Sequence, residues 1–298
     1  MNKNLIVIVG PTAAGKTARA LELGPRVNGE VISADSRHVY TQMDIGTNKP
    51  TQEECAAVPH HLLNVREPHE SFSLAEYVKL ARAAIAEIQS RGKTPMLVGG
   101  TGQYVRAVLE GWQVPEVPPN DAIREKWLAY EQQHGQAALF AELLARDPQS
   151  NESIDPRNVR RVVRALEVME VTGQKWSALQ RRQPLGLEVQ MHEVNLKREE
   201  LYSRADARIA KMLALGWLRE CEALLAFLAA KGFDADAALK LPAMSSLGYR
   251  ELCGVVHGGV GMGLDAAVAQ IKHETRRFIR MQDTWFRKLL SDSDSLTH

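Results

Sequence analysis

The chain has 298 residues, of which 45% are hydrophobic and 24% charged, as is usual for a folded globular protein with a large core. Its 37 lysines and arginines nearly balance 36 aspartates and glutamates, so any site for a polyanion must be a local cluster. The three cysteines are far apart and form no CxxC pair, which excludes a zinc finger and a disulfide framework. Because no membrane span or signal peptide is recognisable either, we expect a cytoplasmic protein without a membrane partner.

Short apolar runs alternate with helical patterns in the first third of the chain. Residues 5–9, 30–34 and 95–98 have the pattern of buried parallel strands, each followed by a polar or glycine-rich turn. Residues 73–91 predict a helix that begins at a capping box and stops at Gly92. This alternation is typical of an α/β fold with a parallel sheet flanked by helices.

The composition changes after residue 112. Three prolines lie within 114–120, and helix-forming residues then dominate to about residue 183, which predicts an all-helical insertion over 113–186. Residues 188–196 are expected to return to the sheet, and 198–290 to be mostly helical, followed by a frayed tail. The predicted organisation is therefore a first core part over 1–112, the insertion, and a completion of the core over 187–298.

An octet directly after the first strand fits the phosphate-loop pattern GxxxxGK[ST] in its usual strand-to-helix context. Glycines let backbone N–H groups converge on phosphate oxygens, and the helix N-terminus adds a favourable dipole. A plain glycine turn is the alternative, and the pattern leaves open whether ATP, GTP or an organic diphosphate is bound. The octet consists of Gly10, Pro11, Thr12, Ala13, Ala14, Gly15, Lys16 and Thr17.

Two further segments follow predicted strands at the edge where open α/β sheets build their sites. Asp35 and Ser36 follow the second strand. Asp35 could hold magnesium, act as a general base, or form a turn cap with Ser36. The Gly-Gly-Thr-Gly turn with Thr101 could approach a substrate or simply join strand to helix.

Seven ordered blocks across most of the chain resemble the bacterial tRNA dimethylallyltransferase family. The resemblance implies a P-loop-kinase-like core, an insertion that grips the tRNA anticodon arm, and Asp35 and Ser36 at the reacting adenine. The blocks are GPTAAGKT at 10–17, ADSRHVYTQMDIGTNKP at 34–50, VPHHLLNV at 58–65, VGGTGQYVRAVLEG at 98–111, NVRRVVRALEV at 158–168, SLGYREL at 246–252 and TRRFIRMQDTWFRK at 275–288.

The resemblance also implies the reaction and its residues. A dimethylallyl group would pass from dimethylallyl diphosphate to N6 of the adenosine 3′ of the anticodon, with Asp35 as general base assisted by Thr101 and Lys16. Mg²⁺ is the expected cofactor, held by Thr17. The octet would bind the diphosphate together with Arg204 and Arg208, although a solvated face paired with Glu200 or Asp206 is the alternative for these arginines.

Arginines at helical spacing in the insertion predict contact with RNA phosphates, because no acid interrupts the segment 157–164. The predicted tRNA-binding residues are these four, Arg157, Arg160, Arg161 and Arg164, and nine implied by the resemblance: Asp35, Ser36, Arg37, His38, Thr101, Ser246, Gly248, Tyr249 and Arg250. The chain departs from the usual pattern of the resembled family at His38, Asn48 and Gln103.

Two other functions remain open at this point. A small-molecule phosphotransferase would use the same loop and acid but consume ATP, and a nucleotide-regulated RNA-binding protein would bind tRNA without forming a product. We expect the prenyl transfer, with tRNA and dimethylallyl diphosphate as partners. Nothing in the sequence implies a protein partner, so a monomer is expected.

Overall fold

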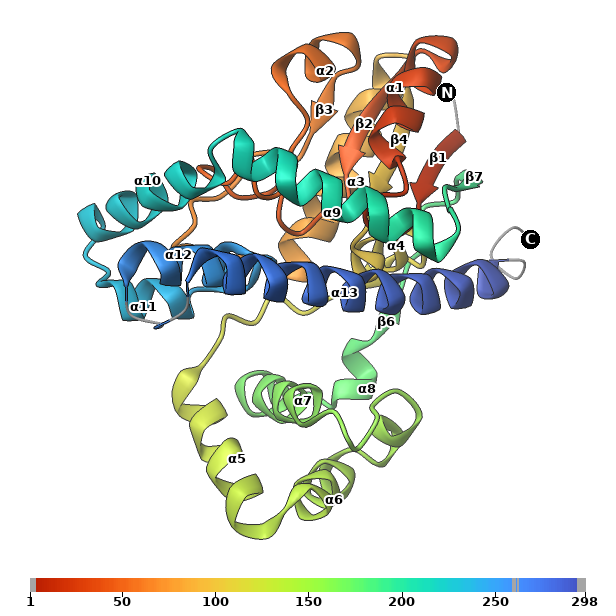
Figure 1. The fold of residues 1–298 in the computed structure, drawn as a ribbon. Coiled ribbons are helices and arrows are strands. Elements are labelled where there is room, and N and C mark those ends of the chain that lie inside the picture. The colour runs from red at the N-terminus through yellow and green to blue at the C-terminus, as the bar shows by residue number, and fades with distance from the viewer. Residues whose placement is uncertain (1–3, 259–260, 262, 294–298) are drawn as a thin grey trace.

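A parallel sheet of five strands forms the centre of the protein, in the order β3-β2-β4-β1-β7 (Figure 1). The structure is a computed structural model that describes residues 4–258, 261 and 263–293. The predicted fold class is confirmed. The strands are β1 (Asn4–Val9), β2 (Gly29–Ser33), β3 (His60–His61), β4 (Thr94–Gly99) and β7 (Glu188–Glu193).

The register of the sheet brings three strand ends level with one another. Val9 of β1 lies opposite Gly99 of β4, and Val98 of β4 lies opposite Ser33 of β2. The predicted strands agree with the structure to within one residue, except that the last ends at Glu193 rather than 196. Strand β3 was not predicted, because a strand of two residues is too short to show a periodic pattern.

The first core part has four helices: three connect its strands, and the fourth follows β4 and leads into the insertion. The helix predicted over 73–91 is present, and both hydrogen bonds of its capping box form between Ser73 and Glu76. Its buried face packs in one cluster with apolar residues of β1, β2 and β4, which closes one side of the sheet. These helices are α1 (Lys16–Val27), α2 (Gln52–Ala57), α3 (Leu74–Ser90) and α4 (Gly102–Leu109).

The helical insertion lies below the core in Figure 1. It has a hydrophobic cluster of its own around Trp127, Leu139 and Leu166. A short antiparallel ribbon of β5 and β6 lies where the chain leaves and re-enters the core, next to the expected boundaries at 113 and 186. The insertion elements are β5 (Trp112–Gln113), α5 (Asp121–His134), α6 (Gln136–Arg146), the 3-10 helix η1 (Pro148–Glu152), α7 (Val159–Thr172), α8 (Trp176–Leu179) and β6 (Arg181–Arg182).

The last part is helical after β7, as predicted. The strand arrows of the sheet point toward α9 and α13. These two helices therefore run across the edge formed by the carboxyl ends of the strands (Figure 1). Helix α13 continues beyond Leu290 to Ser293, and the rest of the expected tail lies outside the described residues. None of the helices in the described ranges has the length and apolarity to cross a membrane. The elements are α9 (Arg198–Ala214), α10 (Trp217–Ala230), α11 (Ala235–Lys240), the 3-10 helix η2 (Pro242–Ser245), α12 (Tyr249–His257) and α13 (Leu264–Ser293).

Candidate active site

The phosphate loop lies between β1 and α1. Gly10 has φ of 152°, and a Cβ at this position would lie 2.0 Å from the carbonyl oxygen of Val194, so only glycine fits. Gly15 has φ of 103° and precedes the first residue of α1, where free N–H groups and the helix dipole favour an anion. This geometry favours the phosphate cradle over a plain glycine turn.

Lys16 is the first residue of α1, and its Nζ donates a hydrogen bond to the Pro11 carbonyl oxygen at 3.0 Å. Burial lowers the pKa of Lys16 to about 8; Asp35 opposes this change and Arg208 adds to it. The ammonium group therefore lies within electrostatic reach of both side chains. A ligand with several negative charges would raise the pKa of Lys16 again and so stabilise its charged form.

Asp35 follows β2, at the same edge of the sheet as the phosphate loop. Its Oδ1 accepts the backbone N–H of Arg37 at 2.9 Å, while no hydrogen bond from the described residues reaches Oδ2. Burial favours the neutral acid, but a charged His38, the Arg37 N–H and Lys16 together hold the pKa of Asp35 below its ordinary value. Burial also lowers the pKa of His38, a change that Asp35 opposes.

The Gly-Gly-Thr-Gly turn lies between the phosphate loop and Asp35, because β4 separates β1 from β2 in the sheet. A Cβ on Gly99 would lie 2.1 Å from the Ala34 carbonyl oxygen, which also accepts the N–H of Thr101 at 3.0 Å. Thr101 Oγ1 in turn accepts the N–H of Ser36 at 2.9 Å. The turn is thus part of the site, and its threonine holds the Asp35–Ser36 segment in place.

The structure separates the two arginines predicted to bind the diphosphate. Burial lowers the pKa of Arg208 and Asp35 opposes this change, so the guanidinium lies within electrostatic reach of the site from α9. Its Nε is buried without a hydrogen-bond partner among the described residues. An unpaired buried donor of this kind suits an anionic ligand. Arg204 is exposed and pairs with Glu200 at 2.7 Å, as the alternative prediction held, so the structure supports Arg208 alone.

Thr17 is the residue predicted to hold Mg²⁺. It is half-buried in the first turn of α1, and its hydroxyl has no hydrogen bond to any described residue. The described ranges contain no cluster of three histidine, cysteine or carboxylate side chains that could hold a metal. A single hydroxyl next to a phosphate loop fits Mg²⁺, which keeps most of its waters and binds mainly through substrate phosphates.

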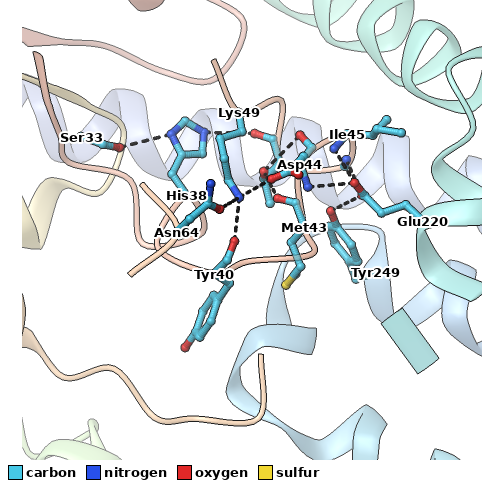
Figure 2. A network of polar contacts seen from close by, with 12 residues as sticks. Ser33, His38, Tyr40, Met43, Asp44, Ile45, Lys49, Asn64, Glu220 and Tyr249 are labelled. Atoms are coloured by element: carbon cyan, nitrogen blue, oxygen red, sulfur yellow. Dashed lines mark hydrogen bonds and ion pairs between the residues drawn. The ribbon is translucent and has the colours of Figure 1, made fainter. Parts of the chain in front are cut away.

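The loop that follows Asp35 is fixed by a buried lysine and a half-buried glutamate, Lys49 and Glu220, shown in Figure 2. Lys49 Nζ donates to the carbonyl oxygen of Tyr40 and to Oδ1 of Asn64, both at 2.6 Å, and to Asp44 Oδ1. Glu220 of α10 accepts three consecutive backbone N–H groups, those of residues 44–46, at 2.6 to 3.0 Å. Multiple charge-assisted hydrogen bonds of this kind make the loop a rigid support for Asp35.

The block SLGYREL packs inside the protein, which corrects most of its predicted RNA contacts. Tyr249 is fully buried and donates its hydroxyl to Glu220, and Ser246 is also buried. A Cβ on Gly248 would lie 2.2 Å from the indole of Trp217, so this glycine allows close packing. Arg250 is exposed and stays available as an RNA ligand.

Arg37 and His38 also take part in internal contacts. Arg37 donates to the carbonyl oxygen of Pro242 at 3.2 Å. The ring of His38 contacts Ser33 Oγ and the Thr47 carbonyl oxygen, each at 3.2 Å (Figure 2). Because the carbonyl can only accept, Nε2 carries the proton and Nδ1 accepts from the Ser33 hydroxyl. His38 therefore braces the loop, and contact of either side chain with RNA stays a prediction.

The other two departures from the resembled pattern lie on the surface. Asn48 has φ of 52°, a left-handed conformation that asparagine adopts more readily than alanine. Gln103 is exposed in the first turn of α4. Neither side chain contributes to the core, so neither departure disturbs the fold.

The four arginines of the insertion that were predicted to contact RNA do not form one uniform face. Arg164 is half-buried and donates to Glu167, a fully buried carboxylate, at 2.6 Å. Arg157 is exposed and pairs with Asp155. Arg160 and Arg161 are exposed on α7 and form no ion pair with the described residues. Of these four arginines, Arg160 and Arg161 are therefore the two best placed to pair with an external anion.

Comparison with known proteins decides the family. The model described as IPP transferase matches residues 38–289, most of the chain. The chain belongs to the IPP transferase family. It is 49% identical over 285 residues to the tRNA dimethylallyltransferase of Chloroflexus aggregans, covering 96% of this chain and 93% of that protein. The corresponding enzyme of Roseiflexus sp. (strain RS-1) is 48% identical over 285 residues, covering 96% and 90%.

Solved structures of IPP transferases agree with this fold. The tRNA isopentenylpyrophosphate transferase of Bacillus halodurans is 36% identical, with a TM-score of 0.67 over 96% of this chain and 87% of that one. A eukaryotic dimethylallyltransferase, solved acting on tRNA, is 28% identical, with a TM-score of 0.78 over 95% of this chain and 70% of that one.

Sequence reasoning missed two residues that shape this IPP transferase site, Gln282 of α13 and Glu220 of α10. Gln282 is 6% exposed and hydrogen-bonds both to the phosphate loop and to the turn after β4. Its signal in the sequence is a polar residue at a buried position of an amphipathic helix. Glu220 had no such signal, because its partners are backbone N–H groups about 175 residues earlier.

Proposed function

We propose that this protein transfers a dimethylallyl group from dimethylallyl diphosphate to N6 of the adenosine 3′ of the tRNA anticodon and releases pyrophosphate. The observation that carries the proposal is the phosphate loop, with Lys16 and Arg208, facing an ionised Asp35 across one edge of the sheet. The names of the relatives support this chemistry. The proposed enzyme acts as a monomer in the cytoplasm.

The chain's own residues divide the reaction between them. The N6 lone pair forms a bond to C1 of the dimethylallyl group while the C1–O bond breaks and its electrons leave with pyrophosphate. Lys16, Arg208 and the loop N–H groups stabilise the charge that grows on the departing oxygens. As the C–N bond forms, N6 becomes acidic, and the free Oδ2 of Asp35 accepts its proton.

Thr17 would hold the magnesium ion, which supplies further charge neutralisation at the diphosphate when bound. The absence of a carboxylate cluster in the described part of the chain suits an ion that arrives with its substrate. The adenine must leave the base stack of the anticodon loop to reach Asp35, as is usual for enzymes that act on a base.

Incubation of the protein with labelled dimethylallyl diphosphate, Mg²⁺ and unmodified tRNA tests the proposal. We expect pyrophosphate release and a mass gain of one dimethylallyl group on the anticodon fragment, both lost with EDTA. Transfer of the γ-phosphate of ATP to a small molecule would instead show a kinase. Tight tRNA binding without a product would show an RNA-binding protein.

The pH dependence of the donor reaction follows from Lys16. Its pKa of about 8 in the free enzyme means that the charged form is lost as the pH rises through that value. We expect kcat/KM for dimethylallyl diphosphate to fall about tenfold per pH unit above this pKa. In the bound complex the diphosphate raises the pKa of Lys16, so kcat should fall only at higher pH. A kcat/KM that is constant through pH 8 to about 9.5 would contradict this role.

Arg161→Ala should weaken tRNA binding and flatten the slope of log Kd against log salt by about one phosphate contact. Arg160→Ala should behave alike, because both side chains are exposed without an ion pair to the described residues. Arg164→Ala should instead lower the thermal stability, since buried Glu167 loses a cationic partner. Fluorescence anisotropy over a range of salt concentrations measures the slopes. Unchanged slopes for both Arg160 and Arg161 variants would remove this face from RNA binding.

A further inference from the structure

Gln282 is a polar residue on the buried face of α13. This face otherwise contains apolar residues such as Ile279, Phe286 and Leu289, each 1% exposed, together with Thr275. A buried amide is costly unless its donor and acceptor are both satisfied. Gln282 meets this condition, since Oε1 accepts the Thr12 N–H at 2.8 Å and Nε2 donates to the Gly100 carbonyl oxygen at 2.9 Å.

The two hydrogen-bond partners of Gln282 allow its side-chain amide only one orientation. A backbone N–H can only donate and a carbonyl oxygen can only accept, so Oε1 must face Thr12 and Nε2 must face Gly100. The fit is close, because a Cβ on Gly100 would lie 2.7 Å from Nε2 and 3.5 Å from Nζ of Lys16. The side chain thus lies at the junction of the phosphate loop and the turn after β4.

The contacts continue from this junction to the proposed base. Thr101, the neighbour of Gly100, binds the Ala34 carbonyl oxygen and the Ser36 N–H, on either side of Asp35. One amide therefore joins the segment that would hold the diphosphate to the segment that would hold the adenine. The phosphate loop follows β1 and the Gly-Gly-Thr-Gly turn follows β4, so the two segments come from the ends of different strands.

We infer that Gln282 is a positioning residue that sets the spacing between the phosphate loop and Asp35. This inference rests on the proposed prenyl transfer. The amide also engages the Thr12 N–H, so that the loop presents its remaining donors to the diphosphate in a preorganised shape. Displacement of reacting groups by about 1 Å can cost about 10² in rate, so loss of the bridge acts mainly on kcat.

Three variants test the inference. Gln282→Met keeps the length of the side chain but removes both hydrogen bonds. Gln282→Glu keeps an acceptor for Thr12 but, when ionised, cannot donate to Gly100. Thr275→Val is the matched control, because Thr275 is 4% exposed on the same face two turns earlier and the substitution is almost isosteric. For each variant we would measure kcat, KM for dimethylallyl diphosphate, the melting temperature, and the affinity for pyrophosphate with Mg²⁺.

We expect Gln282→Met to lower kcat by about 10- to 100-fold with a smaller change in KM, and to weaken pyrophosphate binding at least about fivefold. The Thr275→Val control should match the wild type. Gln282→Glu should also lower kcat by about tenfold or more, because its carboxylate cannot donate to the Gly100 carbonyl oxygen.

A Gln282→Met enzyme whose kcat lies within about twofold of the control would overturn the inference. If that variant does not fold, a Gln282→Glu enzyme whose kcat lies within about twofold of the control would overturn it equally. If the wild type transfers no prenyl group, the proposed function fails. The pyrophosphate affinities alone then test whether Gln282 positions the phosphate loop. Equal affinities for wild type and Gln282→Met would then reject it.

Discussion

Asp35→Asn should lower kcat by about 10² to 10⁴ while leaving tRNA affinity almost unchanged. Asparagine has the same shape as aspartate, and its Oδ1 can still accept the Arg37 N–H that fixes the side chain. It cannot accept the proton that N6 must lose. Single-turnover kinetics at saturating dimethylallyl diphosphate and tRNA would measure the chemical step, and anisotropy would measure tRNA binding.

Asp236→Asn is the matched control for this prediction. It makes the same chemical change at an exposed residue in the first turn of α11, outside the loop that supports Asp35. Its kcat should stay within about twofold of wild type. If Asp35→Asn were as active as this control, Asp35 would not be the base, and the role of the acid would reduce to holding its turn.

Lys16→Met should lower kcat/KM for dimethylallyl diphosphate by about 10² to 10³. Methionine keeps the unbranched stem but removes the ammonium group that stabilises the departing pyrophosphate. Pyrophosphate affinity should fall as well, whereas tRNA affinity should not, because Lys16 is a half-buried member of the phosphate loop. Steady-state kinetics with varied donor and titration with pyrophosphate would measure these effects.

A second lysine provides the comparison for Lys16. Lys79 of α3 is 71% exposed and pairs with Glu116 at 3.4 Å. Lys79→Met therefore removes one positive charge from the surface of the protein. We expect near wild-type kinetics from it. Equal donor kinetics for the two variants would show that the loop binds phosphate through backbone groups alone, or does not bind it.

The phosphate loop, the strands and the capping box of α3 could be predicted because each depends on residues close together in the chain. Glycine at positions 10 and 15 permits the backbone conformation that the loop needs, whatever surrounds it. Ser73 and Glu76 satisfy one another across three residues. The acid at the end of β2 was recognisable for a similar reason, since parallel strands place their carboxyl ends at one edge.

Local spacing could not separate Arg208 from Arg204, because both belong to α9 and are one helical turn apart. Burial against the site distinguishes them, leaving Arg208 with an unpaired donor and Arg204 with Glu200. In the same way, the family resemblance placed Tyr249 at the tRNA, whereas the packing of α10 against α12 buries this side chain.

Short-range backbone geometry and hydrophobic periodicity suffice to predict the α/β class, the phosphate loop and the candidate base from the chain alone. The order of the strands, which inserts the Thr101 turn between loop and acid, and the bridging of these segments by Gln282 became visible only in the folded protein. A hydrogen bond between groups 270 residues apart in the chain leaves no local pattern, because it forms only where packing removes water from both groups.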